Sequence, residues 1–181
     1  MYDIIAQTIG ILAMIVAICS FQQRTQKKIV LFQFVSSILF STHFFMIGAI
    51  TGGILNAIGI VRAAIFSKRD TKAWAAHPVW IYIFSGIFLG VYVLNFTFLG
   101  TAPILRNFLL EILPVIGMVA TTVAFRMKKA AHVRIFSLIS SPLWLVYNVA
   151  NFSLGGILTE AFSLCSIVVG MLRLDIRKKK E

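Results

Sequence analysis

Glu160 is the residue of this chain whose type and position most need a chemical explanation. It lies about five residues inside an apolar segment that begins near Gly155-Gly156. A carboxyl group in such a segment must be neutralised, paired or hydrated, so it can exchange a proton, bind a cation or accept hydrogen bonds from a polar ligand. The sequence leaves these three roles open, and each of them makes Glu160 a candidate for a binding site.

Two other apolar segments carry polar or aromatic side chains at helical spacing, which places them on one face of each helix. The stripe in residues 135–152 consists of Ser137, Ser141, Trp144, Asn148 and Asn151, and the stripe in residues 29–49 of Gln33, Ser36, Ser37, Phe40 and His43. Polar residues within membrane helices usually face the bundle interior or a water-filled path. Small and hydroxyl side chains also hold membrane helices together, so a structural role has equal weight for the serines.

The larger side chains define the predicted substrate site, which consists of Asn56, Glu160, His43, Trp144, Tyr147 and Asn148. Trp144 and Tyr147 offer flat surfaces on which a planar or sugar-like solute can stack. Trp144 lies near the middle of its segment, which favours the wall of a binding site over an interfacial anchor. A lone histidine on an apolar helix is more often a packing residue than a ligand, and for His43 both roles stay open.

Four more residues are candidates for movement or charge pairing. Gln22 follows the end of the first apolar segment, while Pro114 and Pro142 fall within apolar segments, where proline can kink a helix and free a backbone carbonyl. We predict that these three are gating or hinge positions, although Pro114 also fits a helix start. Arg62 either snorkels to lipid headgroups or pairs with Glu160 or an anionic substrate.

The residue types argue against metal binding and catalysis. No second histidine or cysteine lies at metal-ligand spacing from His43, and Cys19 and Cys165 both fall in apolar segments. The sequence also has no glycine-rich phosphate loop, nucleophile elbow or paired His/Glu motif. We therefore expect no metal site, no cofactor and no enzymatic activity.

The elements that must position these side chains are membrane helices. Hydrophobic residues make up 59% of the chain and charged residues 13%, and the mean hydropathy is +0.92, which excludes a soluble domain. About 20 apolar residues span a bilayer. The apolar runs predict seven such segments, roughly 4–21, 29–49, 53–67, 79–97, 108–125, 135–152 and 156–172. We expect the first to be a retained span, because MYDIIAQ lacks the basic start of a signal peptide.

The net charge of +11 is explained by membrane topology. Basic clusters follow the first, third, fifth and seventh segments. In the loops after the second, fourth and sixth segments, Arg106 is the one basic residue. The positive-inside rule then places the N-terminus outside and the C-terminus in the cytoplasm, which requires an odd number of spans. The basic excess also attracts anionic lipid on the cytoplasmic side, and we expect no nucleic-acid partner.

Three blocks of sequence recur in the same order with an offset that drifts from 107 to 104 to 103 positions. They pair Ile9–Ala17 with Ile116–Ala124, Phe32–Leu39 with Phe136–Leu143, and Gly52–Leu55 with Gly155–Leu158. We therefore expect an all-α integral membrane protein with seven transmembrane helices in two parallel three-helix repeats. The repeats occupy 1–68 and 108–173, a linker helix lies at 79–97, and a basic cytoplasmic tail follows at 174–181. In this alignment Asn56 is equivalent to Glu160, and His43 to Tyr147.

This three-plus-one-plus-three pattern resembles the sugar-transporting SWEET proteins, the wider PQ-loop group and importers of the nicotinamide riboside type. The likeness is carried by Phe21-Gln22 where a PQ dipeptide ends the first helix, by Leu143-Trp144-Leu-Val-Tyr147, and by Asn56. It implies a carrier whose substrate lies between two helix triplets. The chain departs from the pattern at Phe21, at Phe125-Arg126 and at Thr159-Glu160, positions that bear on sugar specificity and gating.

Over its whole length the chain more closely resembles the uncharacterised bacterial inner-membrane family labelled YgjV. The residues that carry this likeness are Ser36/Ser37, His43-Phe44-Phe45, Gly48, Leu55-Asn56-Ala57, Leu113–Gly117, Gly155-Gly156 and Glu160. The resemblance covers both repeats and implies a multi-pass protein of the bacterial inner membrane. It supplies no substrate.

We therefore expect a transporter that moves a small polar solute by alternating access between two pseudo-symmetric bundles. The alternative is a non-transporting membrane scaffold or a lipid- or ligand-binding protein, whose polar stripes would pack against each other without a solvated cavity. A sensor that signals through the basic loops is a third hypothesis. Two triplets in one chain remove the need to form a homo-oligomer but do not forbid one.

Overall fold

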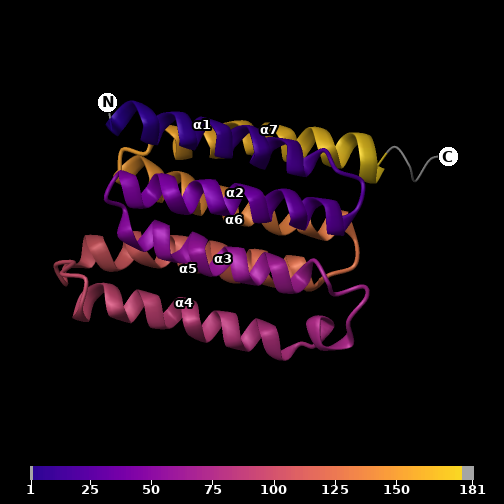
Figure 1. Ribbon diagram of the computed structural model, residues 1–181, viewed down its shortest axis with the longest axis horizontal. Helices are drawn as coiled ribbons and strands as arrows, with labels where there is room; N and C mark the ends of the chain where they lie inside the picture. Colours follow the sequence, from indigo (N-terminus) through magenta and orange to yellow (C-terminus); the bar gives the residue numbers. More distant parts are fainter. Residues whose placement is uncertain (1, 177–181) are drawn as a thin grey trace.

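The computed structural model describes residues 2–176, and in this range seven α-helices lie side by side along one common direction (Figure 1). They are α1 (Tyr2–Phe21), α2 (Gln26–Met46), α3 (Ile50–Phe66), α4 (Val79–Thr97), α5 (Leu105–Arg126), α6 (Ala130–Ala150) and α7 (Leu154–Gly170). A 3-10 helix, η1 (Ala73–Ala76), precedes α4, and a π-helical segment, η2 (Met171–Ile176), continues α7. The predicted tail at 174–181 lies outside the described residues from position 177 onwards.

Six of the helices are long and apolar enough to cross a membrane, namely α1, α2, α4, α5, α6 and α7 together with η2. The remaining helix, α3, is apolar but has 17 residues, at the lower limit of the spanning range. Large apolar side chains such as Leu12, Val93 and Ile139 are exposed on the outer faces of the bundle, as expected for helices in contact with lipid. The prediction of an all-α membrane protein is confirmed, while the seventh span stays a prediction.

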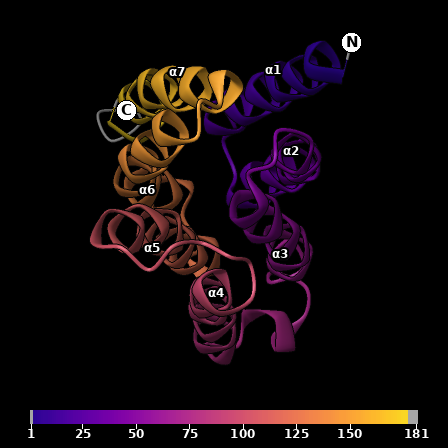
Figure 2. The same ribbon diagram turned by 90° about the vertical axis from the view of Figure 1, so that its left-hand side faces the viewer.

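The helices form two facing layers. Viewed end-on, α1, α2 and α3 lie on one side, and α7, α6 and α5 on the other (Figure 2). Neighbours within each layer pack closely, α1 packs on α7, and α3 packs on α5, whereas α2 and α6 face each other with sparse contact. α4 covers one edge of the bundle against α5 and α3. Space for a cavity therefore lies between α2 and α6.

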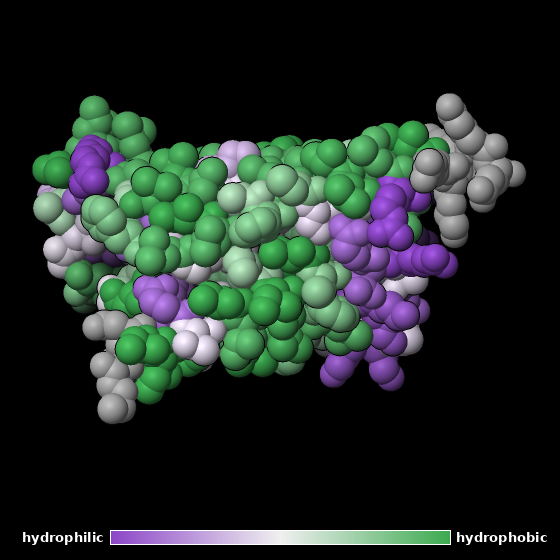
Figure 3. All heavy atoms as spheres, turned by 90° about the horizontal axis from the view of Figure 1, so that it is seen from above, coloured by the Kyte–Doolittle hydropathy of each residue, from purple (hydrophilic) through white to green (hydrophobic). Residues whose placement is uncertain are grey.

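Short turns and polar caps determine where the helices begin. Thr25 caps α2, since its side chain accepts a hydrogen bond from the Lys28 backbone N–H, and Ser153 caps α7 in the same way through Gly156. Gly48 has a φ of 76°, which allows the tight turn between α2 and α3. The turns that contain the basic clusters all lie at one end of the bundle, where hydrophilic residues gather around an apolar body (Figure 3). We call this the basic end.

Two boundaries differ from the sequence-based prediction in a way that affects candidate residues. α5 begins at Leu105, so Pro114 lies in the helix interior and its interpretation as a helix start is wrong. α6 begins at Ala130, earlier than the predicted 135, because charged residues end an apolar run without ending the hydrogen-bonded helix. Arg134 is therefore a helix residue. Pro142 lies inside α6, as expected.

Candidate functional site

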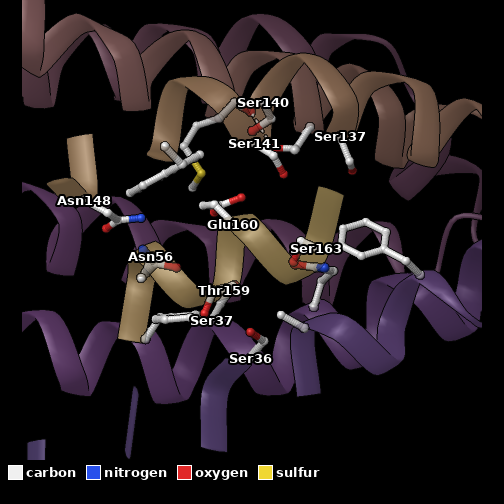
Figure 4. A pocket seen from close by; sticks show the side chains of 18 of the residues that line it. Ser36, Ser37, Asn56, Ser137, Ser140, Ser141, Asn148, Thr159, Glu160 and Ser163 are labelled. Atoms are coloured by element: carbon white, nitrogen blue, oxygen red, sulfur yellow. Dashed lines mark hydrogen bonds between the residues drawn. The ribbon is translucent and has the colours of Figure 1, made fainter. Parts of the chain in front are cut away.

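A cavity of about 100 Å³ lies between the two layers, and side chains from every helix except α4 line it. It is large enough for several water molecules or a small solute. Its lining combines serine and threonine hydroxyls, asparagine and glutamine amides, a few aromatic rings, one carboxyl group and one guanidinium group. Figure 4 shows ten of the polar side chains converging from α2, α3, α6 and α7. The two polar stripes predicted from helical spacing therefore do face each other across a cavity.

Glu160 projects from the second turn of α7 into the centre of this cavity, beside Ser141 (Figure 4). The ion pairs between described residues are Arg69–Asp70 and Arg134–Asp175, so Glu160 has no basic partner within this part of the chain. The Ser141 hydroxyl lies within hydrogen-bonding reach of its carboxyl group, which otherwise borders the cavity.

Asn56, Asn148 and Trp144 also line the cavity. The Asn56 Nδ2 donates to its own helix at Gly52 O over 2.9 Å, which leaves its Oδ1 free of that bond. Asn148 is buried, and its Oδ1 has no hydrogen-bond partner among the described residues. The structure thus brings together four of the six predicted substrate residues: Asn56, Glu160, Trp144 and Asn148.

His43 does not line the cavity, so its predicted role as a substrate ligand is not supported. It is fully buried, with Nδ1 at 2.8 Å from Ala6 O and Nε2 at 3.1 Å from the Ser153 Oγ. Because a carbonyl oxygen can only accept, Nδ1 carries the proton, and a neutral ring then accepts at Nε2 from the serine hydroxyl. Ser153 in turn accepts from Gly156 N. His43 therefore joins α2 to α1 and to the start of α7.

Tyr147 also lies outside the cavity, between α6 and α3. Its hydroxyl oxygen accepts a hydrogen bond from the Gly52 backbone N–H at 3.1 Å, and its side chain is buried. It joins α6 to the first turn of α3, so it is a contact between helices and not part of the substrate wall.

Arg62 faces the cavity but is engaged by α5. Its Nη1 lies 2.8 Å from Met118 O and 2.8 and 3.0 Å from the hydroxyls of Thr121 and Thr122, and its guanidinium lies over the Phe125 ring at 4.9 Å. The side chain is 5% exposed, so it does not snorkel to headgroups, and it does not pair with Glu160. Arg62 instead joins α3 to α5, because its Nη1 donates to the carbonyl and hydroxyl oxygens of α5 and its guanidinium packs on the Phe125 ring.

Gln22 lies at the basic end, where α1 meets α7. Its Nε2 donates to both the backbone oxygen and the Oγ of Ser166, at 2.9 and 2.8 Å. It does not line the cavity, and its predicted place near an end of the bundle agrees with this contact.

The sequence analysis missed a buried ion pair at the basic end. The Arg134 side chain has no exposed surface, donates to Phe21 O and Gln23 O at 3.0 and 2.6 Å, and pairs with Asp175 at 2.7 Å. The predicted segment 135–152 leaves Arg134 in the preceding basic loop, whereas it lies in α6. The available signal was Asp175, a single acid within the basic stretch 173–180.

A second carboxyl group, Glu111 on α5, lies beside Thr51 and Asn95 and does not line the cavity. Arg106 is exposed on the first turn of the same helix and forms no ion pair with Glu111.

An all-helical, multi-pass membrane protein with a polar cavity between two helix layers is the class that this fold and site define. The chain belongs to the family described as bacterial inner membrane protein (YgjV type), whose model matches residues 4–178. It is similar to the inner membrane protein YgjV of Escherichia coli strain K12, with 24% identity over 176 residues that cover 97% of this chain and 87% of that protein. No solved structure matches the chain.

The predicted likeness to the YgjV family is therefore confirmed, and with it a multi-pass location in the bacterial inner membrane. The likeness to SWEET and PQ-loop proteins stays a prediction.

Proposed function

We propose that this protein is a transporter that moves a small polar solute across the inner membrane by alternating access. The observation that carries the proposal is the polar cavity, whose lining comes from both layers and includes an unpaired carboxyl group. Polar groups in a membrane protein are costly unless they pack together or face water or a ligand. A scaffold would be expected to have its polar stripes packed against each other, whereas here they border a space. No catalytic step forms part of this proposal.

We further propose that α3 is a seventh span and that α1–α3 and α5–α7 are parallel repeats, joined by α4 and related by an axis along the membrane normal. The packing supports this arrangement. A rotation about this axis would carry α1 onto α5 and α7 onto α3. The contact of α1 with α7 should therefore have a counterpart between α5 and α3, and both contacts are present. It also places α2 opposite α6 across the axis, as in Figure 2.

Hydrogen bonds at the basic end support the same symmetry. The Gln26 Nε2, on the first turn of α2, donates at 2.6 Å to Phe125 O near the end of α5. Arg134 Nε, near the start of α6, donates at 3.0 Å to Phe21 O at the end of α1. Phe21 and Phe125 each lie at the end of the first helix of their repeat. The start of each middle helix therefore holds the end of the other repeat's first helix.

An equivalent pair of contacts occurs at the opposite end of the bundle. His43 on α2 contacts Ser153 at the start of α7, and Tyr147 on α6 contacts Gly52 at the start of α3. His43 and Tyr147 are the equivalent residues in the sequence alignment. Each middle helix thus holds the third helix of the other repeat at this end. In the proposed cycle the two sets of contacts open in turn, which exposes the cavity first to one side and then to the other.

The proposal places the basic end in the cytoplasm and the N-terminus outside, because basic loops are retained on the cytoplasmic side. The exposed cations at this end would then lie against anionic lipid headgroups. Alkaline phosphatase fused after α7 should be inactive and a fluorescent protein at the same place active. The reverse result would contradict this orientation.

Thiol labelling tests alternating access directly. Cys19 and Cys165 are first replaced by serine, and single cysteines are then placed at Asn56, Ser141 or Asn148 in the cavity. A small, membrane-impermeant thiol reagent added to either side of sealed vesicles should react with the same cysteine from both sides.

Two control cysteines show what labelling from one side and protection by lipid look like in this experiment. A cysteine at Lys27, an exposed residue on the first turn of α2, should react from the cytoplasmic side alone, and one at Ile139 on the outer face of α6 should be protected by lipid. If no cavity position reacts from either side in folded protein, the scaffold hypothesis is correct and the transport proposal is not.

A further inference from the structure

The hydrogen-bonding groups around the cavity are unevenly occupied. Several donors of the lining are already used, almost all of them on backbone carbonyl oxygens of the surrounding helices. These donors belong to Gln33, Ser36, Asn56, Thr121, Ser140 and Thr159. A hydroxyl that has donated its proton still offers oxygen lone pairs, and so does an amide oxygen. These side chains therefore present mainly acceptors to a ligand.

One acceptor in the cavity, the Glu160 carboxyl group, has no counter-charge among the described residues. It lies within hydrogen-bonding reach of the Ser141 hydroxyl. It has no basic partner in this part of the chain, since the cation that shares the cavity, Arg62, is engaged by oxygens of α5. A carboxylate without a counter-charge is costly in a membrane protein, so a ligand that completes this site would supply hydrogen-bond donors and a positive charge.

The aromatic part of the lining suits a cation as well. Phe44 stacks on Trp144 with ring centroids 6.1 Å apart and on Phe40 at 5.8 Å, and all three rings line the cavity near Asn148 and Glu160. The faces of aromatic rings carry negative potential and attract ammonium groups. Acceptor oxygens, a carboxylate and aromatic faces together form a site for an organic cation.

We propose that the transported solute is a small primary amine, whose ammonium group binds Glu160 while its remaining O–H or N–H groups donate to the hydroxyl oxygens of the serine and threonine side chains in the lining. This inference rests on the proposed transport function and names the chemical class of its substrate. A neutral polyol would satisfy the oxygens but leave the carboxylate without a counter-charge. A proton would neutralise Glu160 without using the other oxygens of the lining or the rings. The cavity volume limits the solute to a few non-hydrogen atoms.

A matched pair of probes isolates the amino group. 2-Amino-1,3-propanediol and glycerol have the same size and two hydroxyl groups in common, and they differ by one amino group in place of the third hydroxyl. Thermal unfolding of the purified wild-type protein is measured at pH 7 across a concentration series of each. We expect the amine to raise the unfolding temperature in a saturable manner, because a ligand that binds the folded state stabilises it, and glycerol at equal concentration to leave it unchanged.

Two variants with the same chemical change then locate the amino group. In Glu160→Gln the affinity for the amine should fall by about tenfold or more, because a charged hydrogen bond is lost. In Glu111→Gln, which changes a carboxyl group outside the cavity, the preference for the amine should persist.

Three results would overturn the inference: equal binding of the two probes, no binding of either, or an amine preference that survives in Glu160→Gln. The wild-type comparison decides the matter even if the Glu160 variant does not fold. Cavity cysteines that react from both sides, together with equal probe binding, would retain the transport proposal and remove only this choice of substrate.

Discussion

Gly156 determines whether the Asn148 side chain can reach the cavity. A β-carbon at position 156 would clash with the Asn148 amide and with the Ser153 hydroxyl, which caps α7. Both groups are buried, so they cannot move aside without disturbing the helix start. We expect Gly156→Ala to destabilise the protein by about 1–3 kcal/mol, the usual range for overpacking a well-packed site. Thermal unfolding in detergent measures this directly.

Gly86 on α4 supplies the control for that substitution. A β-carbon there meets no atom within 4 Å, so Gly86→Ala changes only the helix propensity of an exposed position. We expect an unchanged or slightly raised unfolding temperature, because alanine favours a helix over glycine by about 1 kcal/mol. If the two variants lost the same stability, the loss at Gly156 would not come from the contact with Asn148.

At the scale of elements, Arg134 holds three chain segments together at the basic end. It lies on α6, donates to the end of α1 and pairs with Asp175 on η2. In Arg134→Ala the carboxylate and two carbonyl oxygens would lose a donor while remaining largely enclosed. We expect a loss of roughly 3 kcal/mol, as when one partner of a buried pair is removed. Asp175 is 18% exposed, so solvent would reduce this loss somewhat.

Lys27→Ala is the matched control, because Lys27 is an exposed cation at the same end of the bundle. Its unfolding temperature should stay close to that of the wild type, since isolated surface charges contribute little to stability. Equal losses in the two variants would indicate that the net charge of the basic end matters and that the specific pair does not.

Pro142 and Pro114 remove hydrogen bonds from the interiors of α6 and α5, both in the second half of the chain. If these positions act as hinges, Pro142→Ala should leave solute binding unchanged and slow transport, since a regular helix bends less readily. Flux into proteoliposomes and binding to detergent-solubilised protein separate the two effects. A variant with wild-type flux would show that α6 does not need this hinge.

The elements themselves could largely be predicted from the sequence, because long apolar runs bounded by charges leave few alternatives to membrane helices. The face of each helix could be predicted as well, as the stripe containing Ser137, Ser141, Trp144 and Asn148 lines the cavity. What could not be predicted was the contact of a side chain at the edge of a stripe. Trp144 and Asn148 line the cavity, whereas Tyr147, one residue before Asn148 and about 100° round the helix from it, contacts α3 instead.

The partners of charged residues could not be predicted from the sequence either. Arg62 could reach lipid, Glu160 or a neighbouring helix by its spacing alone, and only the packing of α3 on α5 selects the third choice. The buried role of Arg134 depends on how α1, α6 and η2 meet, which no pattern within one segment encodes. Interactions between segments distant in the chain therefore account for most of the differences from the sequence-based site.

At the scale of the whole molecule, the hydrogen bonds that close the two ends of the cavity should have opposite effects on the ratio of the two transport states. Tyr147→Phe removes the oxygen that accepts from Gly52 at the end opposite the basic end, and Gln26→Leu removes the amide that donates to Phe125 O at the basic end. Each change deletes one hydrogen bond between the halves, worth about 1 kcal/mol. If the protein alternates between two states, this energy shifts their ratio by about fivefold.

The two shifts should have opposite signs. With a single cysteine at Asn148, Tyr147→Phe should raise the rate of labelling from the outside about fivefold and lower that from the cytoplasm, and Gln26→Leu should do the reverse. The double variant should return both rates towards the wild type, because the two losses cancel in the ratio of states. Labelling that rises from both sides in either single variant would mean that the ends open independently. The polar cavity would then be a passive pore or a loosely packed interior, and alternating access would not be its mechanism.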